Sequence, residues 1–123
     1  MEFLRATGSP ANSSLRRLLE EGAVATTEVV VMEVLAGARD PRHLQALRRL
    51  MLGCLLVPIE GLIDYEAASA IYRRCRARGE TVRALTDCLI AGVAIRADLA
   101  LIHADSDFDT IARHTDLKTA ALS

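Results

Sequence analysis

Apolar residues along this chain fall into two patterns: short continuous runs, and longer stretches with apolar positions three or four residues apart. The spaced stretches are typical of amphipathic helices, and the continuous runs have the length of buried strands. Glycines follow several of the spaced stretches, as expected at helix ends. Helices are therefore expected at 13–22, 27–37, 41–51, 63–78, 83–96 and 107–114, and strands at 23–26, 54–59, 99–104 and 117–121.

Strands that alternate with helices favour a parallel sheet covered by helices on both faces. We therefore predict an α/β fold, a three-layer α/β/α domain with a mainly parallel central sheet. The 123 residues suffice for a single domain spanning 1–123 and not for two. Apolar residues make up 51% of the chain and aromatic residues only 3%, so the core must consist mainly of aliphatic side chains.

The beginning of the chain does not fit this pattern. Open α/β domains usually begin with a central strand, whereas Met1–Gly8 has the character of a helix. The first strand of the sheet is therefore expected to be missing.

Composition argues against several classes of protein. No apolar run reaches the ~20 residues that span a bilayer, and the N-terminus does not have the pattern of a signal peptide. Three widely spaced cysteines, Cys54, Cys75 and Cys88, suit a reducing cytoplasm better than a disulfide framework or a zinc site. We expect a cytoplasmic domain with no membrane partner.

The net charge of −1 does not by itself predict a polyanionic partner, but four arginines cluster near the end of one expected helix. They are Arg73, Arg74, Arg76 and Arg78. Arginine suits bidentate contacts with phosphate or carboxylate groups. An ordinary solvated helix face explains the same cluster equally well.

Four acidic residues occupy positions where packing alone would not place them. Glu33 lies within an apolar helical segment, and Asp87 opens a stretch that has no other charge up to Ile95. Asp105 and Asp107 follow a buried strand. Ionised carboxylates are rarely buried without a partner, and ligands of α/β sheets bind at the carboxyl ends of the strands. We therefore expect these acids to converge on one pocket.

Each of these acids also has a structural explanation. Glu33 can face solvent on its helix, Asp87 can cap the helix that follows it, and Asp105 or Asp107 can cap the next one. His103, at the end of the same strand, is expected to be a hydrogen-bonded structural residue rather than a catalyst.

Converging carboxylates with no balancing Lys or Arg repel each other unless a cation joins them. Oxygen ligands alone select a hard ion, Mg²⁺ or Mn²⁺, over zinc. Such an ion can activate water and stabilise charge on a phosphodiester. The pattern therefore indicates metal-dependent hydrolysis of a phosphate ester.

Three segments, in their order and spacing, also resemble a known protein family. The segments are Val30–Gly37 around Glu33, Thr81–Ala91 around Asp87, and His103–Phe108 with its two aspartates. In this order they closely resemble PIN-domain toxins of the VapC type, and the similarity extends over essentially the whole chain.

The resemblance implies a three-layer fold around a parallel sheet and a Mg²⁺- or Mn²⁺-dependent endoribonuclease that acts on structured RNA such as tRNA or rRNA. Glu33, Asp87 and Asp105 would be its catalytic acids, and all three would bind the metal together with Asp107. It also implies a VapB-type antitoxin, which usually inserts a segment across the acidic pocket, and a toxin homodimer.

The chain departs from the family at its beginning. Family members open with an apolar strand that ends in Asp followed by Thr or Ser, and that Asp is the first metal ligand. Here Met1–Gly8 resembles the helix that follows this motif, so we expect the reading frame to continue upstream and encode the strand. If Met1 is the true start, the alternative function is a catalytically impaired PIN-like module that binds antitoxin or RNA without cleaving.

Overall fold

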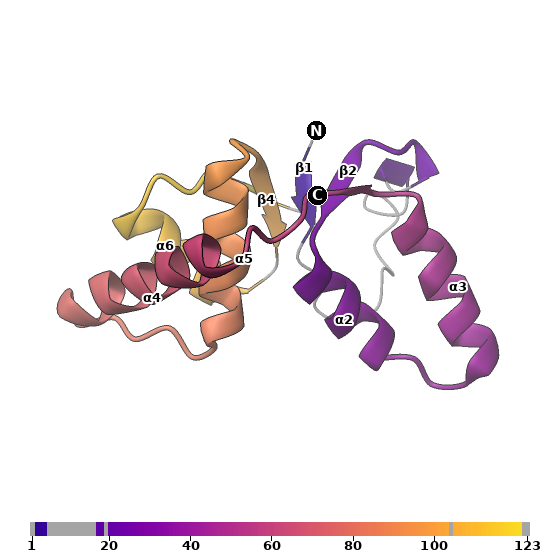
Figure 1. The fold of residues 1–123 in the computed structure, drawn as a ribbon, viewed down its shortest axis with the longest axis horizontal. Helices are drawn as coiled ribbons and strands as arrows, with labels where there is room; N and C mark the ends of the chain where they lie inside the picture. The colour runs from indigo at the N-terminus through magenta and orange to yellow at the C-terminus, as the bar shows by residue number, and fades with distance from the viewer. Residues whose placement is uncertain (1, 5–16, 19, 104, 122–123) are drawn as a thin grey trace.

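A parallel sheet forms the centre of the domain (Figure 1). The computed structural model describes residues 2–4, 17, 18, 20–103 and 105–121. Neighbouring strands are all parallel and lie in the order β3-β2-β1-β4-β5. Their carboxyl ends therefore lie along one edge of the sheet. The strands are β1 (Glu2–Leu4), β2 (Val24–Thr26), β3 (Leu55–Leu56), β4 (Ala100–His103) and β5 (Thr119–Ala121).

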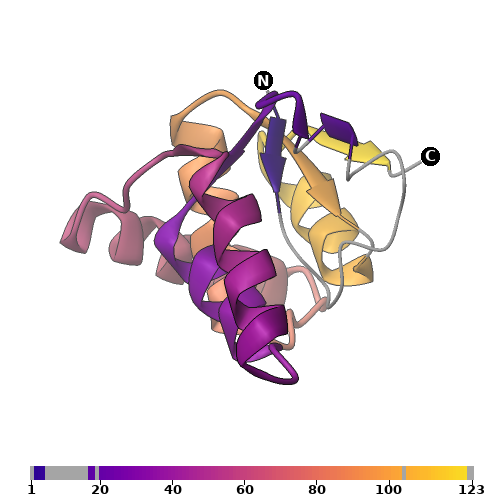
Figure 2. The same ribbon diagram turned by 90° about the vertical axis from the view of Figure 1, so that its right-hand side faces the viewer.

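Helices cover both faces of this sheet, which confirms the predicted three-layer α/β/α arrangement. In Figure 1, α2 and α3 lie on one side of the strands, and α4, α5 and α6 lie on the other. Figure 2, turned by 90°, shows that β1 and β4 point in the same direction. Within the described part of the chain, no helix is both long and apolar enough to cross a membrane. The helices are α2 (Glu28–Ala36), α3 (Pro41–Leu52), α4 (Leu62–Ala77), α5 (Leu85–Arg96) and α6 (Ser106–His114).

The order of the elements agrees with the prediction, while their boundaries shift by a few residues. The strand expected at 54–59 is shorter, because Pro58 has no N–H to donate to a neighbouring strand. The helix expected at 83–96 begins at Leu85 instead. The helix expected at 13–22 is helical at residues 17, 18 and 20, and its remaining N-terminal part lies outside the described residues.

The beginning of the chain supplies the central strand, so the prediction that this strand is missing is wrong for the described structure. Residues 2–4, expected to be helical, form β1, which pairs in parallel with both β2 and β4. Without a strand between them, β2 and β4 would leave backbone groups unpaired in the middle of the sheet. The other residues of Met1–Gly8 lie outside the described residues. The expectation of a coding sequence upstream of Met1 stays a prediction.

Helix α5 explains the long apolar stretch in the sequence, because every residue from Asp87 to Ala94 is buried. Helix α4 packs closely against it. A side chain at Gly92 would already be in van der Waals contact with Ile71 Cδ1, at 3.7 Å, and with Ala67 Cβ, at 3.8 Å. This packing fixes the position of α5 and therefore of Asp87 in its first turn.

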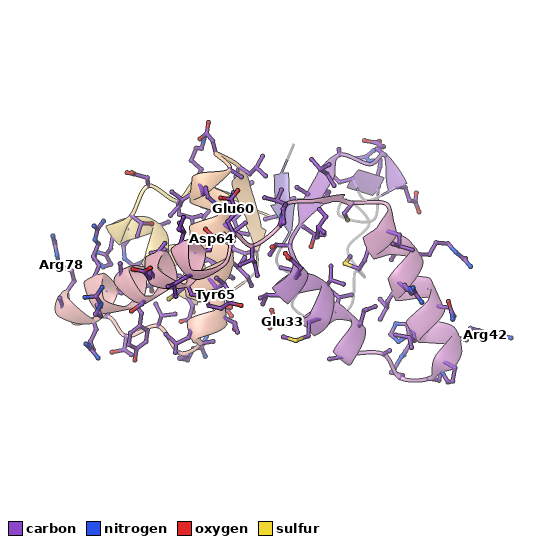
Figure 3. All side chains as sticks on the ribbon, in the orientation of Figure 1. Glu33, Arg42, Glu60, Asp64, Tyr65 and Arg78 are labelled. Atoms are coloured by element: carbon purple, nitrogen blue, oxygen red, sulfur yellow. The ribbon has the colours of Figure 1, made fainter. Side chains whose placement is uncertain are left out.

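A buried ion pair joins the beginning of α4 to the end of α5. Asp64 is 1% exposed, and its carboxylate accepts hydrogen bonds from Arg96 Nε and Nη2, both at 3.0 Å, and from the Glu60 N–H at 2.7 Å. Figure 3 shows Glu60 and Asp64 close together at this end of α4. Burial raises the pKa of Asp64, but these hydrogen bonds and the Arg96 charge outweigh it and hold the pKa below its ordinary value.

Replacing Arg96 by Met should lower the free energy of unfolding by about 3 kcal/mol or more, because it leaves the Asp64 charge buried without its partner. Urea denaturation at neutral pH measures the loss. Since folding lowers the pKa of Asp64, the pair makes its full contribution to stability at pH values above the ordinary aspartate pKa of about 4. That contribution disappears as the pH falls through the lower pKa of the folded state, so the deficit of Arg96→Met should shrink in acid.

The matched control is Arg113→Met, which removes an exposed ion pair with Glu80. Exposed pairs contribute up to about 1 kcal/mol. Equal losses in the two variants would contradict the argument from burial.

Candidate metal centre

Three aspartates meet at the edge of the sheet where the strands end. Asp105 follows β4, Asp107 lies in the first turn of α6, and Asp87 lies in the first turn of α5. One carboxylate oxygen from each lies within 4.8 Å of the other two. Asp87 and Asp107 are buried and Asp105 is half-buried. The fold therefore concentrates negative charge at one largely shielded position.

Helix α6 begins in this group, and Asp105 is its N-cap. Asp105 Oδ1 accepts a hydrogen bond from the Asp107 N–H at 2.9 Å, which satisfies one of the free N–H groups at the start of the helix. Asp87 does not cap α5, whose N-cap is Ala84, so the capping explanation of Asp87 is wrong. Both Asp87 and Asp107 lie in the first turn of a helix, where the helix dipole stabilises negative charge.

Arg83 belongs to this site, although the sequence analysis did not single it out. Its Nη2 lies 3.2 Å from Asp105 Oδ1, and its Nε lies 3.3 Å from Asp107 Oδ2. Its backbone N–H donates to Asp107 Oδ2 at 3.2 Å. The charges of Asp107 and, second, Asp105 raise the pKa of Arg83. The premise that no Lys or Arg balances these acids is therefore wrong.

The point at which α5 begins decides which acid Arg83 contacts. In a helix beginning at residue 83, Arg83 would share a face with Asp87, four residues later. Helix α5 instead begins at Leu85, and Arg83 is free to turn toward the N-terminus of α6.

Glu33 reaches the interior from α2. In Figure 3 its side chain projects from α2 toward the half of the domain that contains α5. Its Oε1 atom is buried, so the carboxylate does not simply face solvent. Among the residues that the structure describes, the carboxylate oxygens that lie within 4.8 Å of one another belong to Asp87, Asp105 and Asp107. Glu33 is not part of this group. A metal-binding function of Glu33 stays a prediction.

His103 accepts a hydrogen bond at one ring nitrogen, and its structural role stays a prediction. Nδ1 accepts a hydrogen bond from the Asp105 N–H at 3.3 Å, and Nε2 lies 3.5 Å from Asp109 Oδ1. The ring packs against Phe108 with centroids 5.4 Å apart. His103 therefore contacts the turn that carries Asp105.

The buried thiol beside the aspartates remains protonated. Burial, together with the nearby Cys75, Asp87 and Asp107, raises the pKa of Cys88 to about 12. Among the described residues, the group of ligand atoms within 4.8 Å of one another contains the three aspartates and not Cys88. The donor set of this site consists of carboxylate oxygens.

The arginines near the end of α4 are exposed and make separate local contacts. Arg74 donates to the His114 carbonyl oxygen at 3.4 Å, and the Arg76 guanidinium lies 5.6 Å from the centre of the Tyr72 ring. Figure 3 shows Arg78 projecting from the end of α4. Phosphate binding by this cluster stays a prediction.

The sheet order and the acidic edge define a known class of domain. The model of the family described as "PIN domain" matches residues 1–114, so the chain belongs to the PIN-domain family.

Similar proteins place the chain within that family. It is 46% identical over 123 residues to Ribonuclease VapC11 of Mycobacterium tuberculosis and to the VapC ribonuclease Mb1587 of Mycobacterium bovis, covering 98% of this chain and 92% of each relative. The chain is therefore a PIN domain of the VapC type. Its fold also matches VapBC2 from Rickettsia felis bound to a DNA fragment, with a TM-score of 0.74, 16% identity and 100% of both chains covered. At that identity, this match shows the fold alone.

The helix cap made by Asp105 and its predicted function as a metal ligand should be separable by mutation. Asp105→Ser keeps a capping oxygen and removes the charge, whereas Asp105→Ala removes both. Asp105→Ala should therefore be less stable than Asp105→Ser by about 1 kcal/mol in urea denaturation. Both variants should lose affinity for Mn²⁺ to a similar degree in calorimetric titration. Equal stability of the two variants would show that the cap contributes nothing.

Proposed function

We propose that this chain is a Mg²⁺- or Mn²⁺-dependent endoribonuclease toxin that cleaves structured RNA. The observation that carries the proposal is the meeting of Asp87, Asp105 and Asp107 within 4.8 Å. They meet at the carboxyl edge of a parallel sheet, where α/β domains bind their ligands. The ribonuclease activity named for relatives that are 46% identical supports the same conclusion.

The chemistry of the site fits a hard divalent cation. All three aspartates offer oxygen, and no cysteine or histidine among the described residues joins their group. Mg²⁺ is typically bound by one or two carboxylates and keeps several waters. Asp87, Asp105 and Asp107 would hold the ion, and we propose Glu33 as a further ligand from α2. When bound, the ion would supply an activated water and stabilise charge on the phosphodiester.

The protein's own groups position the substrate. The N-termini of α5 and α6 both lie at the site, and helix N-termini attract phosphate groups through their free N–H donors. Contacts with phosphates favour recognition of RNA by its shape rather than by its base sequence. The proposed catalytic acids are Glu33, Asp87 and Asp105, and the proposed substrate is a folded RNA of the tRNA or rRNA class.

A VapB-type antitoxin is the proposed partner of this chain. Solved structures of similar fold include VapBC assemblies from Rickettsia felis and Salmonella typhimurium. Between α2, α3 and β3 lies a groove of about 510 Å³. Met32 and Leu52 line it and are 60% and 76% exposed. We propose that an apolar segment of the antitoxin binds there, in the cytoplasm, and continues across the acidic edge.

We propose a homodimer formed through α4 and the start of α5. Leu62 and Tyr65 lie one helical turn apart on α4 and are 72% and 53% exposed. Leu85, which is 61% exposed, lines the same shallow pocket as Tyr65. A second copy related by a twofold axis would cover this apolar surface on both chains.

The alternative is a module that binds antitoxin or RNA without cleaving. It rests on the sequence after β1, where Arg5 follows Leu4 and no Asp ends the strand. The alternative is not favoured, because relatives that match 98% of this chain are named ribonucleases.

Replacing Asp87 by Asn should abolish metal-dependent RNA cleavage and leave the fold intact, because it removes a charge without changing side-chain volume. Cleavage of total tRNA and of rRNA, with Mg²⁺, with Mn²⁺ and with EDTA, measures the effect. The matched control is Asp98→Asn, which removes the same charge at an exposed residue that pairs with Lys118. Wild-type cleavage by Asp87→Asn, or cleavage that persists in EDTA, would refute the metal mechanism.

A change of Leu85 to Asp should convert the dimer to a monomer, because two copies of the new carboxylate would be buried in the apolar interface. Size-exclusion chromatography with light scattering gives the mass. Leu52→Asp, in the groove proposed for the antitoxin, should leave the dimer intact. A wild-type chain that is monomeric at all concentrations would contradict the proposed interface.

A further inference from the structure

The Arg83 guanidinium contacts the same carboxylates that offer ligands to a metal ion. Nη2 lies 3.2 Å from Asp105 Oδ1, and Nε lies 3.4 and 3.3 Å from the two oxygens of Asp107. A divalent cation on these oxygens would lie close to the guanidinium, and the two positive charges would repel each other. Arg83 and a metal ion therefore compete for two of the three aspartates.

The side chain of Arg83 is held weakly. It is 73% exposed, whereas the side chains of Asp105 and Asp107 are 22% and 10% exposed. Its contacts of 3.2–3.4 Å are longer than the ~2.7–2.9 Å typical of strong charge-assisted hydrogen bonds. A competing cation, which neutralises the two shielded carboxylates in place of Arg83, can therefore replace these contacts.

The backbone at this position is held independently of the side chain. The Arg83 N–H donates to Asp107 Oδ2, and the preceding Val82 is 1% exposed within the core. The guanidinium can therefore leave the carboxylates while the backbone remains in place beside the metal centre.

We propose that Arg83 is a displaceable counter-ion: it neutralises Asp105 and Asp107 until a divalent cation binds them, and the released guanidinium then binds an RNA phosphate next to the site. The second step rests on the proposed ribonuclease function. A guanidinium matches the geometry of a phosphate group and makes bidentate hydrogen bonds to it. Arg83 therefore opposes metal binding and favours substrate binding, two effects of opposite sign that a purely structural residue would not produce.

The test compares Arg83→Gln in the full chain with the wild-type protein. Calorimetric titration with Mn²⁺ alone should give a dissociation constant about threefold lower or more in the variant, because no guanidinium has to be displaced. RNA cleavage at saturating Mn²⁺ should show kcat/KM reduced about tenfold, because a charged phosphate contact is lost. The matched control is Arg113→Gln, which removes the same charge from an exposed pair with Glu80 and should change neither quantity appreciably.

A Mn²⁺ affinity in Arg83→Gln no higher than in Arg113→Gln would overturn the counter-ion proposal. A raised metal affinity with unchanged kcat/KM would overturn the phosphate contact. In the wild-type protein, the NMR signal of the Arg83 Nε–H should shift as Mg²⁺ binds, and a signal that does not move would also overturn the proposal. If the wild-type chain cleaves no RNA, the proposed function fails, while the Mn²⁺ titration still tests the competition between Arg83 and metal.

Discussion

Repulsion between like charges at the carboxyl edge of the sheet is the constraint on which the site depends. The parallel strands and two helix N-termini bring Asp87, Asp105 and Asp107 within 4.8 Å. Three features of the fold reduce the resulting cost: the dipoles of α5 and α6, the N–H groups that donate to Asp105 and Asp107, and the charge of Arg83. The same concentration of negative charge is the basis of the proposed binding of a divalent cation.

The position of Asp87 depends on how α5 is held at its other end. Helix α5 spans Leu85–Arg96 and is about 18 Å long, at 1.5 Å per residue. Its residues from Asp87 to Ala94 are buried. Arg96 fixes the far end through Asp64 and through the Pro58 carbonyl oxygen, to which it donates at 2.8 Å. Because a packed helix moves as a unit, this ion pair also helps to fix the Asp87 carboxylate at the candidate metal centre.

Hydrophobic periodicity predicted most helices and strands of the fold. It did not predict features that depend on a few contacts between segments distant in the sequence. The α/β class and the helices α2 to α6 follow from apolar spacing. Strand β1 was missed because Glu2–Leu4 is too short to show a period, and its pairing with β2 and β4 depends on distant segments. The expected helix from residue 83 would already place Arg83 beside Asp87, but its observed contacts with Asp105 and Asp107 join segments that are distant in the sequence, which periodicity does not relate.

Arg83 and Arg96 show that burial decides what an arginine–aspartate pair does. Arg96 is 28% exposed and binds the almost fully buried Asp64 at 3.0 Å, so separating the pair would leave a charge in the core. Arg83 is 73% exposed and binds its aspartates at 3.2–3.4 Å, so a cation that neutralises the more shielded Asp105 and Asp107 can take its place. The buried pair is therefore suited to fixing a helix, and the exposed pair is suited to exchange with a cation. A sequence contains the same two residue types in both cases, and only the fold distinguishes the two functions.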